Sequence, residues 1–80
     1  MYIDIATDFL INSKEVIGIF DLDNTTVNQF TRDYLNSKQK ENKLIYLIKD
    51  LPKSFILVTD GTVYVVELSS QVLRKRLEII

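Results

Sequence analysis

The stretch of sequence that decides the fold covers residues 55–66 and reads FILVTDGTVYVV. Its two halves are rich in β-branched and aromatic residues, which favour strands, and they flank Asp60-Gly61. Asp60 and Gly61 tolerate the positive φ angles of a two-residue turn, so the stretch predicts a tight β-hairpin. The expected register pairs Val58 with Val63, Leu57 with Tyr64, Ile56 with Val65, and Phe55 with Val66.

Both faces of this hairpin are apolar in the expected register. One face covers the chain's own core, and the other must meet a second layer or another subunit. Two sets of side chains suit the second role, namely Ile56, Val58, Val63 and Val65, or Phe55, Leu57, Tyr64 and Val66. Of these we assign Phe55, Leu57, Tyr64 and Val66 to an oligomer interface.

The sequence before the hairpin predicts four further strands and one helix. Short apolar runs indicate strands at residues 2–5, 9–11, 16–20 and 44–48. A helix is expected to begin at Thr26, with Gln29 as its capping-box partner, and to end near Gln39. Its apolar stripe consists of Val27, Phe30, Tyr34 and Leu35.

After the hairpin, Ser69 and Ser70 predict the start of a second helix, which covers Gln71 to about Leu77. The expected fold class is therefore α+β. It contains a small, mostly antiparallel sheet of about six short strands, with one amphipathic helix after the third strand and a short helix at the C-terminus.

Chain length and composition favour one self-associating domain. The 80 residues suffice for a single domain, residues 1–80, with one small core. Small domains usually need a disulfide, a metal or a partner subunit for stability. The chain has no Cys and no His, so disulfides and the usual zinc sites are excluded. A homo-oligomer is the remaining expectation.

No targeting or membrane segment is expected. Residues 1–12 include Asp4 and Asp8 and lack the basic start of a signal peptide. No apolar run approaches the ~20 residues needed to cross a bilayer. We therefore expect a cytoplasmic protein without a membrane partner.

The charge is unevenly distributed along the chain. Residues 1–37 contain two basic and six acidic residues, a net charge of −4, whereas residues 38–80 contain eight basic and five acidic residues, a net charge of +3. This division suits head-to-tail self-association, and it also suits an anionic ligand at the basic half.

Residues 17–26, IGIFDLDNTT, resemble the first motif of haloacid-dehalogenase-type phosphatases. In that family the first Asp is the nucleophile, and Asp21, Asp23 and Thr25 occupy the motif's positions here; Thr59 imitates the Thr of the second motif. The later acidic pair that completes the magnesium site has no counterpart, and the predicted hairpin makes the second motif antiparallel. We therefore expect no enzyme, no metal and no cofactor.

The order of segments resembles the RemA/RemB family of bacterial extracellular-matrix regulatory proteins, and specifically its RemB branch. The resemblance covers nearly the whole chain and rests on five segments in order. They are Met1-Tyr2-Ile3, residues 14–21 (KEVIGIFD), residues 31–35 (TRDYL), residues 52–56 (PKSFI) and, at the end, Val63-Tyr64 with residues 69–76 (SSQVLRKR).

The resemblance implies a DNA-binding transcriptional regulator of biofilm matrix genes from Firmicutes, assembled as a ring-like homo-oligomer on double-stranded DNA. In the RemA branch an Arg precedes the third strand and an Arg pair precedes the hairpin. Glu15 and Leu51-Pro52 stand at those places here. The alternative hypothesis is a homo-oligomeric scaffold that binds protein, for example a RemA-like partner, and not DNA.

The nucleic-acid-binding residues that we predict are the cations of the loop before the hairpin and of the last helix. They are Lys49, Lys53, Arg74, Lys75 and Arg76. The competing interpretation of the C-terminal cations is a helix end whose positive charge complements the macrodipole.

Overall fold

The computed structural model describes residues 1–22 and 29–78 of the chain. The described residues form six strands, two α-helices and one short 3₁₀ turn. In chain order these are β1 (Tyr2–Ala6), β2 (Phe9–Asn12), the turn η1 (Ser13–Glu15), β3 (Val16–Asp21), α1 (Gln29–Lys40), β4 (Leu44–Leu47), β5 (Ser54–Val58), β6 (Val63–Val66) and α2 (Ser70–Glu78). The predicted α+β class is confirmed, and the predicted helix start at Thr26 lies outside the described residues.

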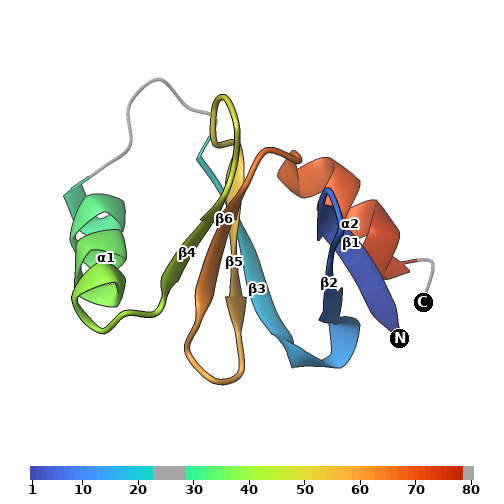
Figure 1. Ribbon diagram of the computed structural model, residues 1–80, viewed down its shortest axis with the longest axis horizontal. Helices are drawn as coiled ribbons and strands as arrows, with labels where there is room; N and C mark the ends of the chain where they lie inside the picture. Colours follow the sequence, from blue (N-terminus) through green and yellow to red (C-terminus); the bar gives the residue numbers. More distant parts are fainter. Residues whose placement is uncertain (23–28, 79–80) are drawn as a thin grey trace.

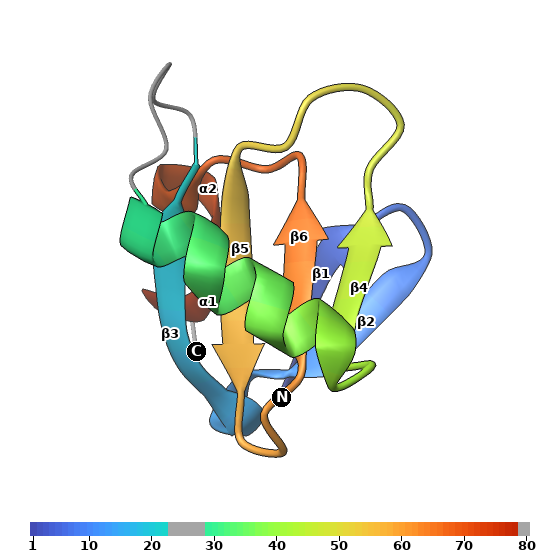
Figure 2. The ribbon, with the colours of Figure 1, turned by 90° about the vertical axis from the view of Figure 1, so that its left-hand side faces the viewer.

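The elements form three layers, with a four-stranded sheet in the middle (Figure 1). Helix α1 covers one face of this sheet and crosses it diagonally (Figure 2). The β1–β2 hairpin and α2 lie on the other face. The central sheet has the order β3-β5-β6-β4, in which β4 pairs in parallel with β6 and the other pairs are antiparallel. The expectation of a mostly antiparallel arrangement is therefore confirmed.

The β5–β6 hairpin is present, but the predicted register is wrong by one residue. Leu57 pairs with Val63, and Val58 N–H donates to the carbonyl of Thr62 at 3.0 Å. The loop therefore contains three residues, with Gly61 at φ 89° in the left-handed region. The Asp60 carboxylate accepts a 2.8 Å hydrogen bond from Thr62 N–H, which stabilises this wider turn.

The corrected register redistributes the apolar side chains of the hairpin between two core clusters. Phe55, Val63 and Val65 pack with Leu57 on the α1 face. Ile56, Val58 and Val66 pack with Tyr64 under the β1–β2 hairpin and α2. Each face is therefore covered by a layer of the same chain.

Helix α1 packs on the sheet less extensively than its apolar stripe predicts. Tyr34 and Leu35 contact the cluster around Phe55, whereas Phe30 is 86% exposed. Phe30 belongs to the expected apolar stripe but does not pack on the sheet, because the first turn of α1 lies at the β3 edge, where nothing among the described elements covers it (Figure 2). Val27 lies outside the described residues.

The C-terminal helix begins as predicted. Ser69 Oγ accepts a 3.2 Å hydrogen bond from Val72 N–H and so caps the first turn of α2. Leu73 is fully buried and fixes α2 against the second face of the sheet. Neither of the two described helices is long and apolar enough to cross a membrane.

Candidate nucleic-acid interface

The loop between β4 and β5 carries the first two predicted cations on a fixed backbone. Glu67 Oε1 accepts hydrogen bonds from the backbone N–H groups of Lys49 and Asp50, each at 2.5 Å. Lys53 N–H donates to the carbonyl of Val66 at 2.9 Å. The side chains of Lys49 and Lys53 therefore extend into solvent from a loop that is held at both ends.

Glu67, the residue after β6, carries the negative charge that the backbone of this loop contacts. Its two backbone hydrogen bonds, and then the charges of Lys49 and Lys53, hold the pKa of its carboxyl below the usual value. The carboxylate stays ionised at neutral pH and offsets part of the positive charge of the two lysines. The loop is thus a modest site for a phosphate group.

The three predicted cations of α2 have different surroundings. Arg74 and Lys75 are exposed in the second turn of the helix. Arg76 is partly buried, and its Nη1 donates a 2.7 Å hydrogen bond to the main-chain carbonyl of Asp4. Arg76 therefore joins α2 to β1, while Arg74 and Lys75 remain available to an anionic partner.

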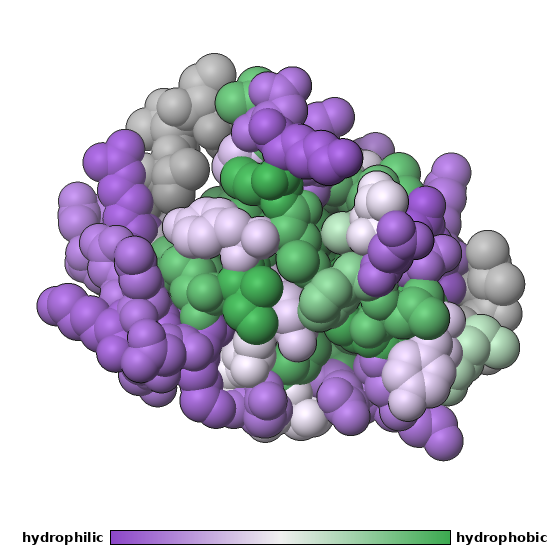
Figure 3. Space-filling model, in the orientation of Figure 1, coloured by the Kyte–Doolittle hydropathy of each residue, from purple (hydrophilic) through white to green (hydrophobic). Residues whose placement is uncertain are grey.

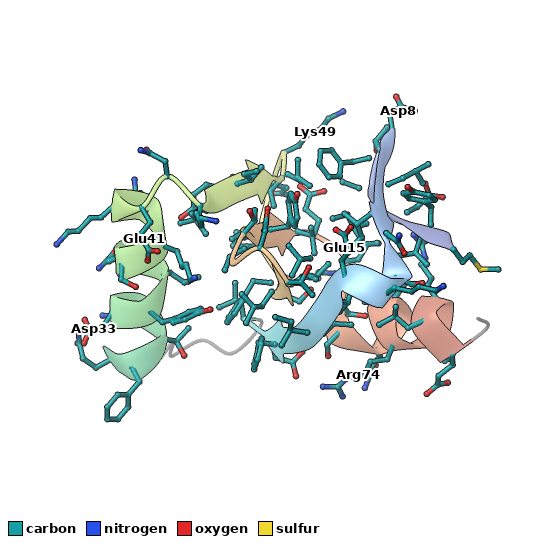
Figure 4. The ribbon with its side chains drawn as sticks, turned by 90° about the horizontal axis from the view of Figure 1, so that it is seen from below. Asp8, Glu15, Asp33, Glu41, Lys49 and Arg74 are labelled. Atoms are coloured by element: carbon teal, nitrogen blue, oxygen red, sulfur yellow. The ribbon has the colours of Figure 1, made fainter. Side chains whose placement is uncertain are left out.

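The five predicted residues do not form one continuous patch. Lys49 and Arg74 point to opposite sides of the molecule (Figure 4). Lys49 and Arg76 line the same hollow of about 630 Å³, which the acidic side chains Asp4 and Asp8 also line. Arg74 and Lys75 thus form the one predicted pair of neighbouring, exposed cations without an acid next to them in the sequence.

A basic cluster at the end of α1 is not among the predicted residues. Lys38 Nζ and Lys43 Nζ lie 3.4 and 3.7 Å from the position that a Cβ at Gly61 would occupy. Lys43 Nζ also donates to the carbonyl of Asp60, and Lys38 Nζ lies 5.6 Å from the centre of the Tyr34 ring. The signal was the spacing of Lys38, Lys40 and Lys43 in the sequence, but only the fold brings Lys38 and Lys43 to the hairpin turn.

The predicted oligomer interface is divided by the corrected register. Phe55 and Leu57 face α1, and Tyr64 and Val66 face the β1–β2 layer. Phe55 and Val66 are buried within the chain, whereas Leu57 and Tyr64 are partly exposed. The centre of the Tyr64 ring lies 5.3 Å from the centre of the Phe9 ring. Burial raises the pKa of the Tyr64 hydroxyl, and the charges of Asp60 and Glu15 raise it further. A role for these four in self-association stays a prediction.

The phosphatase-like motif lacks its structural context. Strand β3, which ends at Asp21, pairs antiparallel with β5, whereas the phosphatase motif requires parallel strands. Asp23 and Thr25 lie outside the described residues. Within residues 1–22 and 29–78, no three acidic side chains gather closely enough to hold a metal ion.

No protein-family profile matches the sequence. The chain is 33% identical over 76 residues to extracellular matrix regulatory protein B of Bacillus subtilis (strain 168). This alignment covers 95% of the chain and 89% of the relative. This relative places the chain among the extracellular-matrix regulatory proteins. It belongs to the RemA/RemB family of extracellular-matrix regulatory proteins and is RemB-like.

Proposed function

We propose that this chain is a cytoplasmic transcriptional regulator that binds the DNA of extracellular-matrix (biofilm) genes as a ring-like homo-oligomer. The observation that carries the proposal is the 33% identity, over 95% of the chain, to a protein named as a matrix regulator. Residues 1–80 act as one regulatory domain. The chain has no catalytic role and requires no cofactor.

The DNA contacts are made mainly by Arg74 and Lys75. Both are exposed on α2, and the partly buried Arg76 holds that helix against β1. Lys53 and Lys49 add phosphate contacts from the loop on the other side. Because these side chains contact phosphates, specificity comes from DNA bending and groove shape more than from base edges.

Assembly compensates for the small number of cations in each subunit. For each phosphate that a subunit neutralises, the logarithm of its DNA-binding constant falls with the logarithm of the salt concentration with a slope of about −0.9. A subunit with only two or three such contacts therefore binds DNA weakly on its own. Several copies on one duplex raise the effective concentration of each further contact. The net charge of −1 for each chain is therefore compatible with DNA binding by the oligomer.

The second candidate function is a scaffold that binds protein, such as a RemA-like partner, without contacting DNA. The number of large apolar side chains that are exposed among the described residues favours it. They are Met1, Tyr2, Leu10, Ile17, Phe20, Phe30, Ile45, Tyr46, Leu51 and Val72. Glu15 and Leu51, which stand where the RemA branch has arginines, also favour this alternative.

The deciding experiment compares two matched double charge reversals. Arg74→Glu with Lys75→Glu changes α2, and Arg32→Glu with Lys40→Glu makes the same charge change on exposed positions of α1. The two helices lie at opposite ends of the molecule (Figure 1). Mobility shift of a promoter-length duplex at low salt and sedimentation velocity are measured for each variant.

The regulator hypothesis requires that the α2 variant loses the mobility shift and keeps its oligomeric mass, while the α1 variant keeps both. Equal loss of binding in the two variants would mean that net charge, and not the α2 surface, governs the interaction. No shift by the wild-type oligomer would leave the scaffold hypothesis in place of the regulator.

A further inference from the structure

Within residues 1–22 and 29–78, the central sheet has two edges that no further strand covers, and both are apolar. Strand β3 forms one edge and β4 the other (Figure 2). Ile17 and Phe20 on β3 are 60% and 45% exposed, and Ile45 and Tyr46 on β4 are 39% and 56% exposed. An apolar edge strand with unpaired backbone groups favours pairing with another strand, and natural proteins usually protect such edges with charge or proline.

The surface along β4 is open to a partner. Figure 3 looks onto this edge and shows hydrophobic surface between α1 and the β1–β2 hairpin. The hollow of about 630 Å³ lies at the same place, lined by Tyr46, Leu47 and Ile48 from the β4 side and by Ile5 and Ala6 from β1. An additional strand beside β4 would cover Tyr46, the most exposed of these side chains.

The residues that flank the two edge strands carry opposite charges at the same spacing. Glu15 and Asp21 flank or end β3, six positions apart, and both are exposed. Lys43 and Lys49 flank β4, also six positions apart. Lys43 Nζ donates to the Asp60 carbonyl, but an ammonium group has three donors and retains capacity for a carboxylate.

The strand directions fix how the two edges can meet. Strand β3 runs antiparallel to β5, β5 runs antiparallel to β6, and β4 runs parallel to β6, so β3 and β4 point the same way. Rotating a second copy about an axis parallel to the strands preserves this direction. Its β3 then meets β4 of the first copy as a parallel neighbour.

We propose that β3 of one copy pairs in parallel with β4 of a second copy of this chain, with Glu15 opposite Lys43, Ile17 opposite Ile45 and Asp21 opposite Lys49. The proposal rests on the self-assembly in the proposed function and assigns its surface. The contact is heterologous, so a rotation that closes gives a ring. It covers the exposed apolar side chains of both edges and pairs the acidic N-terminal half with the basic C-terminal half.

Disulfide trapping tests the pairing directly, because the chain has no Cys of its own. The test variant carries Ile17→Cys and Ile45→Cys. Residues opposite each other on neighbouring strands have Cα atoms within the ~4.4–6.8 Å that a disulfide requires. The control variant carries Ile17→Cys and Leu51→Cys, since Leu51 is 70% exposed, more than Ile45.

Oxidation of the test variant is expected to give a ladder of covalent oligomers on a non-reducing gel, and the control is expected to stay mainly uncrosslinked. A ladder of equal strength in both variants, or none in either, would overturn the proposed pairing.

A charge exchange provides an independent test in the uncrosslinked protein. Asp21→Lys alone and Lys49→Asp alone each place like charges across the interface, and each is expected to lower the oligomeric mass in sedimentation velocity. The double variant restores opposite charges and is expected to recover the wild-type mass. Failure of the double variant to recover, with both single variants still folded by circular dichroism, contradicts the assigned pairs.

The outcomes separate this inference from the proposed function. A wild-type chain that sediments as a monomer at micromolar concentration contradicts the assembly itself. A wild-type oligomer that neither crosslinks selectively nor responds to the charge exchange contradicts only the β3–β4 pairing. Selective crosslinking without a DNA mobility shift supports the pairing and contradicts only the DNA-binding function.

Discussion

Arg76 Nη1 donates a 2.7 Å hydrogen bond to the main-chain carbonyl of Asp4, a residue 72 positions earlier in the chain. This contact joins the last helix to the first strand. Arg76→Ala removes it, and we expect the free energy of unfolding to fall by about 1 kcal/mol, because a hydrogen bond from a charged group is partly screened at this half-exposed site. Urea unfolding measures the change.

The neighbouring Arg74 is the matched control, since it is exposed and lies on the same helix. Arg74→Ala is expected to change the free energy of unfolding by less than about 0.5 kcal/mol. If Arg74→Ala destabilised the chain as much as Arg76→Ala, the hydrogen bond to Asp4 would not be the cause.

Leu73 provides a second prediction about the position of α2. Its side chain is fully buried between the helix and the sheet, so Leu73→Ala leaves a cavity and is expected to cost about 3 kcal/mol. Val72, the preceding residue, is 38% exposed, and Val72→Ala is expected to cost less than about 1 kcal/mol. Similar unfolding midpoints for the two variants would mean that α2 does not dock as described.

Gly61 tests the three-residue hairpin turn. Its φ of 89° lies where L-residues are strained, while a Cβ at this position would make only ordinary contacts with the flexible ends of Lys38 and Lys43. Gly61→Ala is therefore expected to cost about 1–2 kcal/mol through backbone strain alone. Gly61→Asn should cost less, because Asn tolerates the left-handed region. Thermal unfolding of both variants checks this order.

The phosphatase-like residues provide a fourth prediction. Asp21 is exposed at the end of strand β3, which pairs antiparallel with β5. We therefore expect the wild type to hydrolyse p-nitrophenyl phosphate with Mg²⁺ only at the background rate, and Asp21→Asn to leave that rate unchanged. Hydrolysis by the wild type that the variant lacks would show that the motif is catalytic.

Local sequence patterns predicted the positions of the strands and of α2, because those positions follow from residues that are neighbours in the chain. Ser69 caps α2 as expected, and Asp60-Gly61 lies in the turn as expected. The register follows from the length of the loop, which contains three residues and includes the bond from Thr62 N–H to the Asp60 carboxylate. A shift of one residue moves every side chain of a strand to the other face.

The candidate site was less predictable, because charges are brought together or separated by tertiary packing. Arg76 belongs to a basic run in the sequence, but docking of α2 directs it to Asp4 and away from Arg74. Lys38 and Lys43 meet at the hairpin turn because α1 ends there. Helix α1 ends through Asn42, whose backbone is left-handed, and through the hydrogen bond from Lys43 N–H to the Lys38 carbonyl. Neither feature indicates in the sequence that the helix end lies beside the β5–β6 turn.

Glu67 gives the prediction that depends on pH. Its carboxylate holds the β4–β5 loop through the N–H groups of Lys49 and Asp50, and these bonds lower its pKa in the folded chain. A lowered pKa means that the carboxylate stabilises the fold above its unfolded pKa, about 4.3 for Glu. That stabilisation is lost as the pH falls through the folded pKa. Glu67→Gln, which keeps an acceptor oxygen without the charge, should therefore be less stable than the wild type at pH 7.

The difference between wild type and Glu67→Gln is expected to shrink as the pH is lowered from 5, since Glu67 takes up a proton and loses the charge that distinguishes it from Gln. Urea unfolding at each pH measures it. Asp60 also has a lowered pKa, through its hydrogen bond from Thr62 N–H, but it is present in both proteins and cancels in the comparison. A difference that stayed constant over this range, or grew at low pH, would mean that the Glu67 charge does not hold the loop.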